Sequence, residues 1–195
     1  MGAYRIVEKN KENEIEFPIT KAYFLVIILG LIVTPFLLEI ISFLIIILFF
    51  ILFIIVFGII QLYNFGRIPK IKGKYAGTIE FFEDKIQIKS EIYSLSEIST
   101  IRFYVSDYVG KWTILFFSLD PNRSNGSENL IEIVLKTGST IRVFFQLHHS
   151  KQFLENRENL INYHKAGKIS FLKLIEVLQI RKYELIQNFK NELNQ

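Results

Sequence analysis

Histidine, carboxylate and thiol side chains are the groups through which this sequence would hold a metal ion or attack a substrate. The chain has no cysteine, which excludes disulfides, thiolate metal sites and cysteine nucleophiles. His148 and His149 are neighbours, a spacing that suits neither one helical face nor a pair of metal ligands. His164 follows about four helical turns later. The sequence therefore predicts no metal site and no cofactor.

The acidic pairs have the spacing of surface charges. Glu83 and Asp84 are adjacent between two β-prone segments, and Glu155 and Glu158 are spaced as on the outside of a helix. The sequence contains no P-loop, no G-x-G-x-x-G and no G-x-S-x-G motif. We therefore expect a protein that is not an enzyme.

A single glutamate, Glu39, interrupts an apolar run over residues 22–60. One helix of these 39 residues would be roughly 58 Å long, whereas a hydrocarbon layer of about 30 Å needs about 20 residues. Two spans, 22–38 and 40–60, fit that thickness, with Pro35 and Glu39 near the turn. A charge at the centre of a span costs at least about 2.5–3.5 kcal/mol. We expect Glu39 in water at the tip of a helical hairpin; a functional carboxylate inside the membrane is the alternative.

Basic residues flank the apolar run and predict its orientation. Lys9, Lys11 and Lys21 precede the run, four basic residues follow it, and its tip has none. The positive-inside rule then predicts a multi-pass protein of the cytoplasmic (inner) membrane with both termini in the cytoplasm. Near an anionic leaflet each basic residue adds about 1 kcal/mol of attraction. The candidates for anionic-lipid contact are Arg67, Lys70, Lys72 and Lys74, and the alternative is that these charges only set the topology.

Short segments of alternating polarity follow the basic residues and predict a small antiparallel barrel or sandwich. About seven strands are expected at residues 78–82, 85–89, 92–95, 98–105, 112–119, 130–136 and 140–145. Glu83-Asp84 and residues 137–139 have the composition of hairpin turns. Residues 120–129 are rich in turn formers and are expected to form a loop.

Helical spacing begins near residue 148. Residues 148–165 predict one helix, which Gly167 is expected to end. Ser170 is a candidate N-cap for a further helix, and apolar residues recur at steps of three and four over 170–193. The pattern does not decide between one long helix and two short ones broken near residues 179–181. It also leaves open whether this tail packs on its own domain, on a second copy or on another protein.

Two stretches carry a resemblance to a known family. GTIEFFEDKIQIKS (residues 77–90) and YSLSEISTIRF (residues 93–103) resemble the opening of bacterial pleckstrin-homology-like (PH-like) domains. These domains often begin with a G-x-I-x-F-x-x-D-x-I hairpin and then an aromatic-x-x-x-[DE]-I stretch. The resemblance covers about residues 75–165 and implies a seven-stranded antiparallel barrel capped by a C-terminal helix. No lipid-binding residues are carried over, because the first turn is acidic where a phosphate would need donors and positive charge.

These observations predict an α+β protein with a membrane part. The expected segments are an N-terminal cytoplasmic segment 1–21, a transmembrane helical hairpin 22–63, a basic linker 64–74, a PH-like domain 75–166 and a helical tail 167–195. The expected function is protein–protein contact or assembly at the inner membrane face, with an unknown protein partner or as a homo-oligomer. A small oligomeric transport or lipid-handling protein is the alternative, although residues 22–63 offer few polar side chains. The net charge of +4 is too dispersed to predict nucleic-acid binding.

Overall fold

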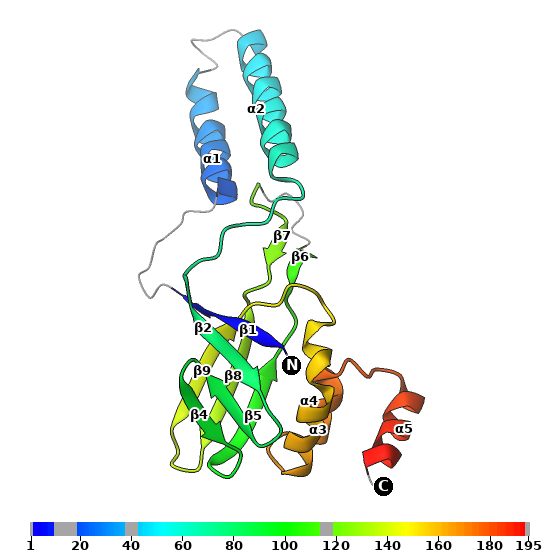
Figure 1. The fold of residues 1–195 in the computed structure, drawn as a ribbon. Coiled ribbons are helices and arrows are strands. Elements are labelled where there is room, and N and C mark those ends of the chain that lie inside the picture. Colours follow the sequence, from blue (N-terminus) through cyan, green and yellow to red (C-terminus); the bar gives the residue numbers. More distant parts are fainter. Residues whose placement is uncertain (1, 10–18, 38–42, 114–118, 194–195) are drawn as a thin grey trace. The chain divides into compact units, whose positions relative to one another are not determined.

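The computed structural model describes residues 2–9, 19–37, 43–113 and 119–193 (Figure 1). The chain divides into two compact units, which are described separately. The sheet unit comprises Met1–Lys11, Lys70–Lys111 and Asn125–Gln195, and the apolar unit comprises Glu12–Pro69 and Trp112–Ser124. The expected tip of the hairpin at Glu39 lies outside the described residues.

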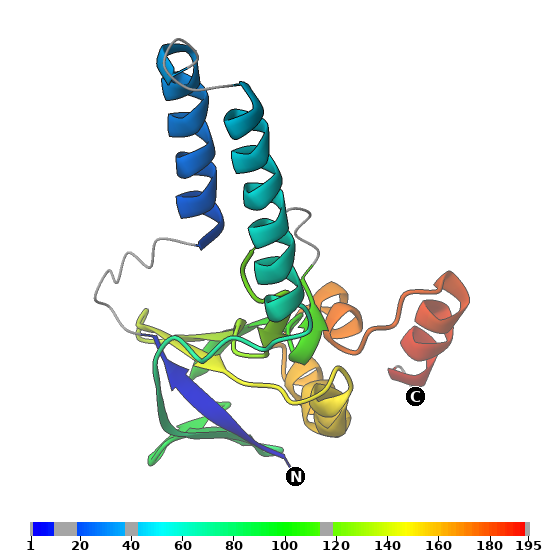
Figure 2. The same cartoon turned by 90° about the horizontal axis from the view of Figure 1, so that it is seen from above.

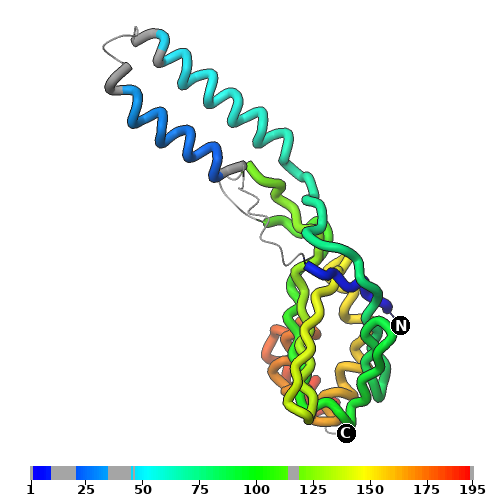
Figure 3. The backbone as a smooth tube through the Cα atoms, turned by 90° about the vertical axis from the view of Figure 1, so that its left-hand side faces the viewer, coloured from blue at the N-terminus to red at the C-terminus, as the bar shows by residue number. Residues whose placement is uncertain are grey.

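The sheet unit contains a seven-stranded sheet with the order β4-β3-β2-β1-β9-β8-β5, and its recorded strand pairs are antiparallel. The strands are β1 (Ala3–Glu8), β2 (Lys74–Phe81), β3 (Lys85–Ile88), β4 (Glu91–Ser94), β5 (Ile98–Tyr104), β8 (Asn129–Leu135) and β9 (Thr140–Phe145). Figure 3 shows β2–β4 and the β5, β8, β9 group on opposite sides of the core. The antiparallel sheet was predicted, but the closed barrel was not correct. The four-residue β4 pairs with β3, and β5 pairs with β8, so these two strands are the edges of an open sheet.

The first strand, β1, was missed by the sequence analysis, which placed residues 1–21 outside the folded domain. Tyr4, Ile6 and Val7 are buried, and β1 pairs with β2 from Ala3↔Glu80 to Glu8↔Lys74. The strand is only six residues long and its partners come much later in the sequence, so its own pattern is a weak signal. Both apolar helices therefore lie in the connection between two paired strands.

A second difference concerns the strand expected at residues 112–119. Residues 114–118 lie outside the described part, and the described strand β6 (Val109–Trp112) ends where the prediction began. β6 forms a separate two-stranded sheet with β7 (Arg123–Asn125), which lies in the expected loop 120–129. Among the described residues the large sheet thus has the predicted number of strands, seven, but one of them is β1, which was not predicted.

A helical segment covers the aromatic part of the core. The 3₁₀ helix η1 (Gln152–Asn156) leads into α3 (Arg157–Lys165), within the region predicted to be helical. Its side chain Phe153 lies 5.3–5.7 Å, between ring centroids, from the aromatic rings of four strands. These rings are Tyr4, Phe81, Phe103 and Phe145. The helix is fixed further by Tyr163, whose hydroxyl donates to the Phe82 carbonyl at 2.6 Å.

The tail forms two helices, α4 (Phe171–Val177) and α5 (Tyr183–Leu193), which Figure 2 shows as separate segments. The predicted N-cap is confirmed, since Ser170 Oγ accepts from the Lys173 amide at 3.3 Å. Gln179 adopts a positive φ of 58° between the helices and interrupts them in the region where the sequence suggested a break. Leu174, Val177 and Phe189 are buried in the same core as the strands, so the tail packs on its own domain.

The apolar unit contains α1 (Ile19–Leu37) and α2 (Phe43–Asn64). One of them, α2, includes an 18-residue stretch, Ile47–Asn64, that is long and apolar enough to cross a membrane. Only 6% of that stretch is buried within the chain. The apolar part of α1, Lys21–Thr34, is shorter. The Tyr23 hydroxyl donates to the Phe53 carbonyl at 2.6 Å, and the two rings stack at 4.2 Å.

Candidate binding pocket and basic segment

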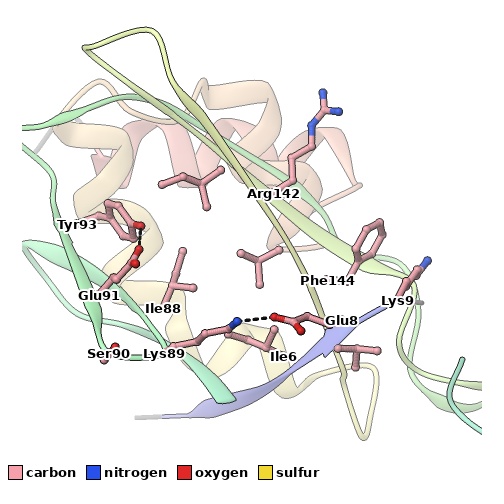
Figure 4. Close-up of a pocket in the computed structure, with 13 residues that line it drawn as sticks. Ile6, Glu8, Lys9, Ile88, Lys89, Ser90, Glu91, Tyr93, Arg142 and Phe144 are labelled. Carbon is pink, nitrogen blue, oxygen red and sulfur yellow. Dashed lines mark hydrogen bonds and ion pairs between the residues drawn. The ribbon is translucent and has the colours of Figure 1, made fainter. Parts of the chain in front are cut away.

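A pocket of about 550 Å³ opens between β1, the β3–β4 turn and β9 (Figure 4). It exists because β1 and β9 separate: β1 pairs with β9 at Ile6↔Phe145, whereas β8 pairs with β9 along its length. Residues 141–144 of β9 are therefore not covered by β1, and they form one wall of the pocket.

Aliphatic side chains form the floor of the pocket. Strand alternation turns Ile6, Ile88, Ile141 and Val143 toward the core, and all four also line the pocket. The aromatic end of this core is covered by Phe153, but its aliphatic end meets the pocket. The core of the sheet is thus accessible from one side, and an apolar group of a ligand would find a hydrophobic surface there.

Charges of both signs surround this floor, and the positive ones are paired. Each of three basic side chains lies against a carboxylate. The ion pairs are Lys89 Nζ–Glu8 Oε1 (2.5 Å), Lys9 Nζ–Glu128 Oε2 (2.6 Å) and Arg142 Nε–Glu132 Oε2 (2.7 Å). An anionic ligand would have to displace carboxylates from these cations, so the pocket is not built to hold a phosphate.

Two ionisable side chains near the pocket, Glu132 and Tyr93, have shifted pKa values. Hydrogen bonds from Arg142 and Arg102 hold the pKa of the Glu132 carboxyl below its usual range. The Tyr93 hydroxyl donates to Glu91, and this hydrogen bond, with burial, raises the pKa of Tyr93 to about 12. At neutral pH Glu132, the partner of Arg142, is therefore ionised, and Tyr93, which lines the pocket, is protonated.

The four basic residues proposed for anionic-lipid contact all have exposed side chains. Arg67 belongs to the apolar unit, whereas Lys70, Lys72 and Lys74 belong to the sheet unit. The Arg67 guanidinium lies 4.4 Å from the centre of the Tyr63 ring, and the Lys70 carbonyl accepts a hydrogen bond from Asn125 Nδ2 at 3.1 Å. Lipid contact by these four residues remains a prediction.

The histidines are separated in the structure as well. Within residues 2–9, 19–37, 43–113 and 119–193, no group of three or more histidine, cysteine or acidic side chains is placed to hold a metal ion. His149 lies 3.9 Å from Glu155, and His164 Nδ1 lies 2.8 Å from the Ile169 carbonyl. These contacts fix side chains of the helical region and assemble no reactive set.

The sequence analysis did not find the pocket. None of the aliphatic floor residues was named as a site. The only available signal was alternation in β1, which would have placed Ile6 inside the sheet. Comparisons with protein-family models, with curated proteins and with solved structures returned no match for the chain.

Proposed function

We propose that this chain is a non-enzymatic, membrane-anchored module that binds a partner protein at the inner face of the cytoplasmic membrane. The observation that carries the proposal is the pairing of Glu8 with Lys74, on either side of the apolar insertion. Two paired strands must be on the same side of a membrane, so the chain between them crosses it an even number of times. If α2 crosses, α1 supplies the second crossing, and the two helices form a hairpin anchor.

The side on which the sheet unit lies follows from charge. Lys9, Lys70, Lys72 and Lys74 lie next to the two ends of the insertion, and the positive-inside rule assigns such residues to the cytoplasm. Both termini are then cytoplasmic and Glu39 is at the outer tip. Two tethers that leave the sheet at paired residues hold the module close to the inner surface, which raises its effective concentration toward other membrane proteins.

The strand order supports the PH-like resemblance as part of this proposal. The large sheet consists of two meanders, β1 to β4 and β5-β8-β9, joined where the first strand pairs with the last, and a helix packs on the aromatic core. The insertion then lies inside the domain, between its first two strands.

The pocket between β1 and β9 favours a protein ligand over a lipid headgroup. Its floor is aliphatic and its three cations already have carboxylate partners. A surface of this kind suits an apolar side chain of a partner, surrounded by polar groups of both signs. We therefore propose that the pocket receives such a side chain.

A transport role receives less support from the described helices. Two hydroxyl groups of these helices are already bonded to backbone carbonyls, Tyr23 to Phe53 and Thr34 to Gly30. A substrate path would need polar groups that are free to bind. The alternative of an oligomeric transporter therefore ranks second.

The anchor can be tested with single cysteines, because the chain has no native one. Glu39→Cys and, separately, Ser139→Cys would be labelled in intact cells and in inverted vesicles with a membrane-impermeant maleimide. We expect position 39 to react in intact cells and position 139 only in inverted vesicles. Reaction of both positions from one side would contradict the hairpin.

The pocket can be tested by photo-crosslinking in membranes. A photoreactive amino acid at Ser90, on the rim, should give a discrete adduct, and one at Ser139, an exposed turn residue outside the pocket, should not. Ile141→Phe, which fills the pocket, should reduce the adduct at position 90. An adduct that is equally strong at both positions, or insensitive to Ile141→Phe, would show that the pocket is not the binding site.

A further inference from the structure

The end of α2 and the segment that follows β6 lie against each other within the apolar unit, although they are far apart in sequence. Asn64 Nδ2 donates to the Leu119 carbonyl at 2.7 Å, and the Gly66 amide donates to Asn122 Oδ1 at 2.8 Å. The rings of Phe65 and Trp112 lie 5.3 Å apart. Hydrogen bonds and a ring contact thus hold Trp112 and its neighbours at the position where the apolar stretch Ile47–Asn64 ends.

Large apolar side chains at this position are exposed. The exposed fractions are 77% for Leu62, 68% for Tyr63, 65% for Phe65 and 47% for Trp112. Such a concentration of exposed apolar groups marks an interaction surface. Tyr and Trp are also the residues enriched where a membrane-spanning helix passes through the headgroup layer.

Two arginines lie on these rings. The Arg67 guanidinium is 4.4 Å from the centre of the Tyr63 ring, and the Arg123 guanidinium is 4.4 Å from that of Trp112. Among the described residues neither arginine forms an ion pair, and Arg123 Nε is buried without a hydrogen-bond partner. This contrasts with the pocket, where every cation already has a carboxylate. A guanidinium offers several donors in a fixed plane, a geometry that matches phosphate oxygens.

We propose that Tyr63, Phe65, Arg67, Trp112 and Arg123 form a contact site for anionic phospholipid, which we name the arginine–aromatic patch. The rings lie at the boundary between headgroups and acyl chains, and the two guanidiniums bind lipid phosphates. The occupant is lipid because the patch continues the apolar surface of α2 and carries two cations without paired acids. This inference rests on the proposed membrane anchor and goes beyond the basic segment at residues 67–74, because Arg123 and Trp112 come from a distant part of the chain.

Trp112 reports directly on the patch, since it is the single tryptophan of the protein. The full chain would be reconstituted in phosphatidylcholine vesicles with and without phosphatidylglycerol, and its fluorescence measured with two quenchers. We expect strong quenching by lipids brominated near the top of the acyl chain and weak quenching by aqueous iodide. Strong quenching by iodide with none by brominated lipid would overturn the proposal.

The role of the arginines is tested by comparing how strongly Trp112 fluorescence is quenched by brominated phosphatidylglycerol and by brominated phosphatidylcholine. Stronger quenching by the anionic lipid is the preference that is measured. Arg67→Gln and Arg123→Gln should each lower this preference by about five-fold. The matched control, Arg181→Gln, removes an exposed arginine of the sheet unit and should leave it unchanged. An unchanged preference in both patch variants would overturn the assignment of the phosphates. Arg67→Gln alters a side chain with no recorded hydrogen bond, so it stays informative if Arg123→Gln fails to fold.

Carbonate extraction of the same vesicles separates failure of the patch from failure of the anchor. A chain that resists extraction but has Trp112 in water would overturn only the patch. A chain that is extracted would overturn the anchor and the patch together.

Discussion

Replacing Tyr4 tests whether the strand before the apolar insertion is essential to the sheet formed after it. The side chain is 1% exposed, and its ring lies 5.6–5.7 Å from those of Phe81, Phe145 and Phe153. Its hydroxyl donates to the Gln152 carbonyl at 3.2 Å and accepts from Asn156 Nδ2. Burial raises the pKa of Tyr4 to about 12, so this donor is intact at neutral pH.

These contacts give two different magnitudes. Tyr4→Ala removes a buried aromatic ring and should lower the free energy of unfolding by about 3–5 kcal/mol. Tyr4→Phe keeps the ring but leaves Asn156, which is 2% exposed, without its acceptor. We expect this variant to cost about 1–3 kcal/mol. Arg5→Ala, at the exposed neighbour, should change stability by less than about 0.5 kcal/mol.

Hydrogen exchange of the β8 amides in the full chain measures this effect away from the mutation. β8 lies in the centre of the other half of the sheet, and its amides exchange when the sheet opens. Native-state exchange in detergent should show the opening free energy of β8 falling in the order Arg5→Ala, Tyr4→Phe, Tyr4→Ala. If β8 exchange is the same in Tyr4→Ala as in the parent, β1 does not contribute to the sheet, and the argument for an even number of membrane crossings fails with it.

Three further predictions concern the sheet unit. The pKa of Glu132 is lower in the folded state, so its ion pairs stabilise the fold above a pH of about 4.3, the pKa of an unfolded glutamate, and this effect is lost as the pH falls through the folded pKa. The loss of stability in Glu132→Gln should therefore become smaller on acidification. A loss that stays constant in denaturant titrations across pH would contradict the role of the two arginines. A Cβ on Gly73 (φ +145°) would lie 2.1 Å from the Glu8 carbonyl oxygen, whereas one on Gly138 (φ +87°) meets no atom within 4 Å. Gly73→Ala should therefore lower the melting temperature more than Gly138→Ala. Equal decreases in melting temperature would argue against close packing at the ends of β1 and β2. Asn129 is fully buried, accepts from the Ser106 and Asp107 amides and donates to the Asp107 and Gly126 carbonyls. In chemical unfolding, Asn129→Ala should lower the free energy of unfolding by about 1–3 kcal/mol for each group left unpaired. A loss no larger than that of the comparison variant Asn125→Ala would refute the hydrogen-bond network.

Local patterns predicted the parts of the fold that depend on neighbouring residues. Alternation identified β3 and β9 closely, and the cap at Ser170 followed from residue type alone. The same reasoning could not find β1, because its partner β2 lies beyond the whole apolar insertion. A strand of six residues carries too little periodicity to reveal such a distant pairing.

The sites depend on still less local features. The pocket arises because β1 separates from β9 after Ile6, and register of this kind is not encoded in composition. The position of Trp112 beside Phe65 depends on hydrogen bonds made by Asn64 and Asn122, two residues that a sequence reader would assign to turns. By contrast, the exposure of Arg67 and the three lysines could be foreseen, because long charged side chains are rarely buried.

The position of the insertion between β1 and β2 also has a consequence for biosynthesis. Residues 9–73 separate the end of β1 from the start of its first partner. At a synthesis rate of about 5–20 residues per second, β1 is synthesised roughly 3–13 s before β2. During that time the nascent N-terminus carries Tyr4, Ile6 and Val7 without their partners, while the two apolar helices are being translated. The sheet can be completed only after both apolar helices have been translated, so with the proposed anchor its assembly would be timed by membrane insertion.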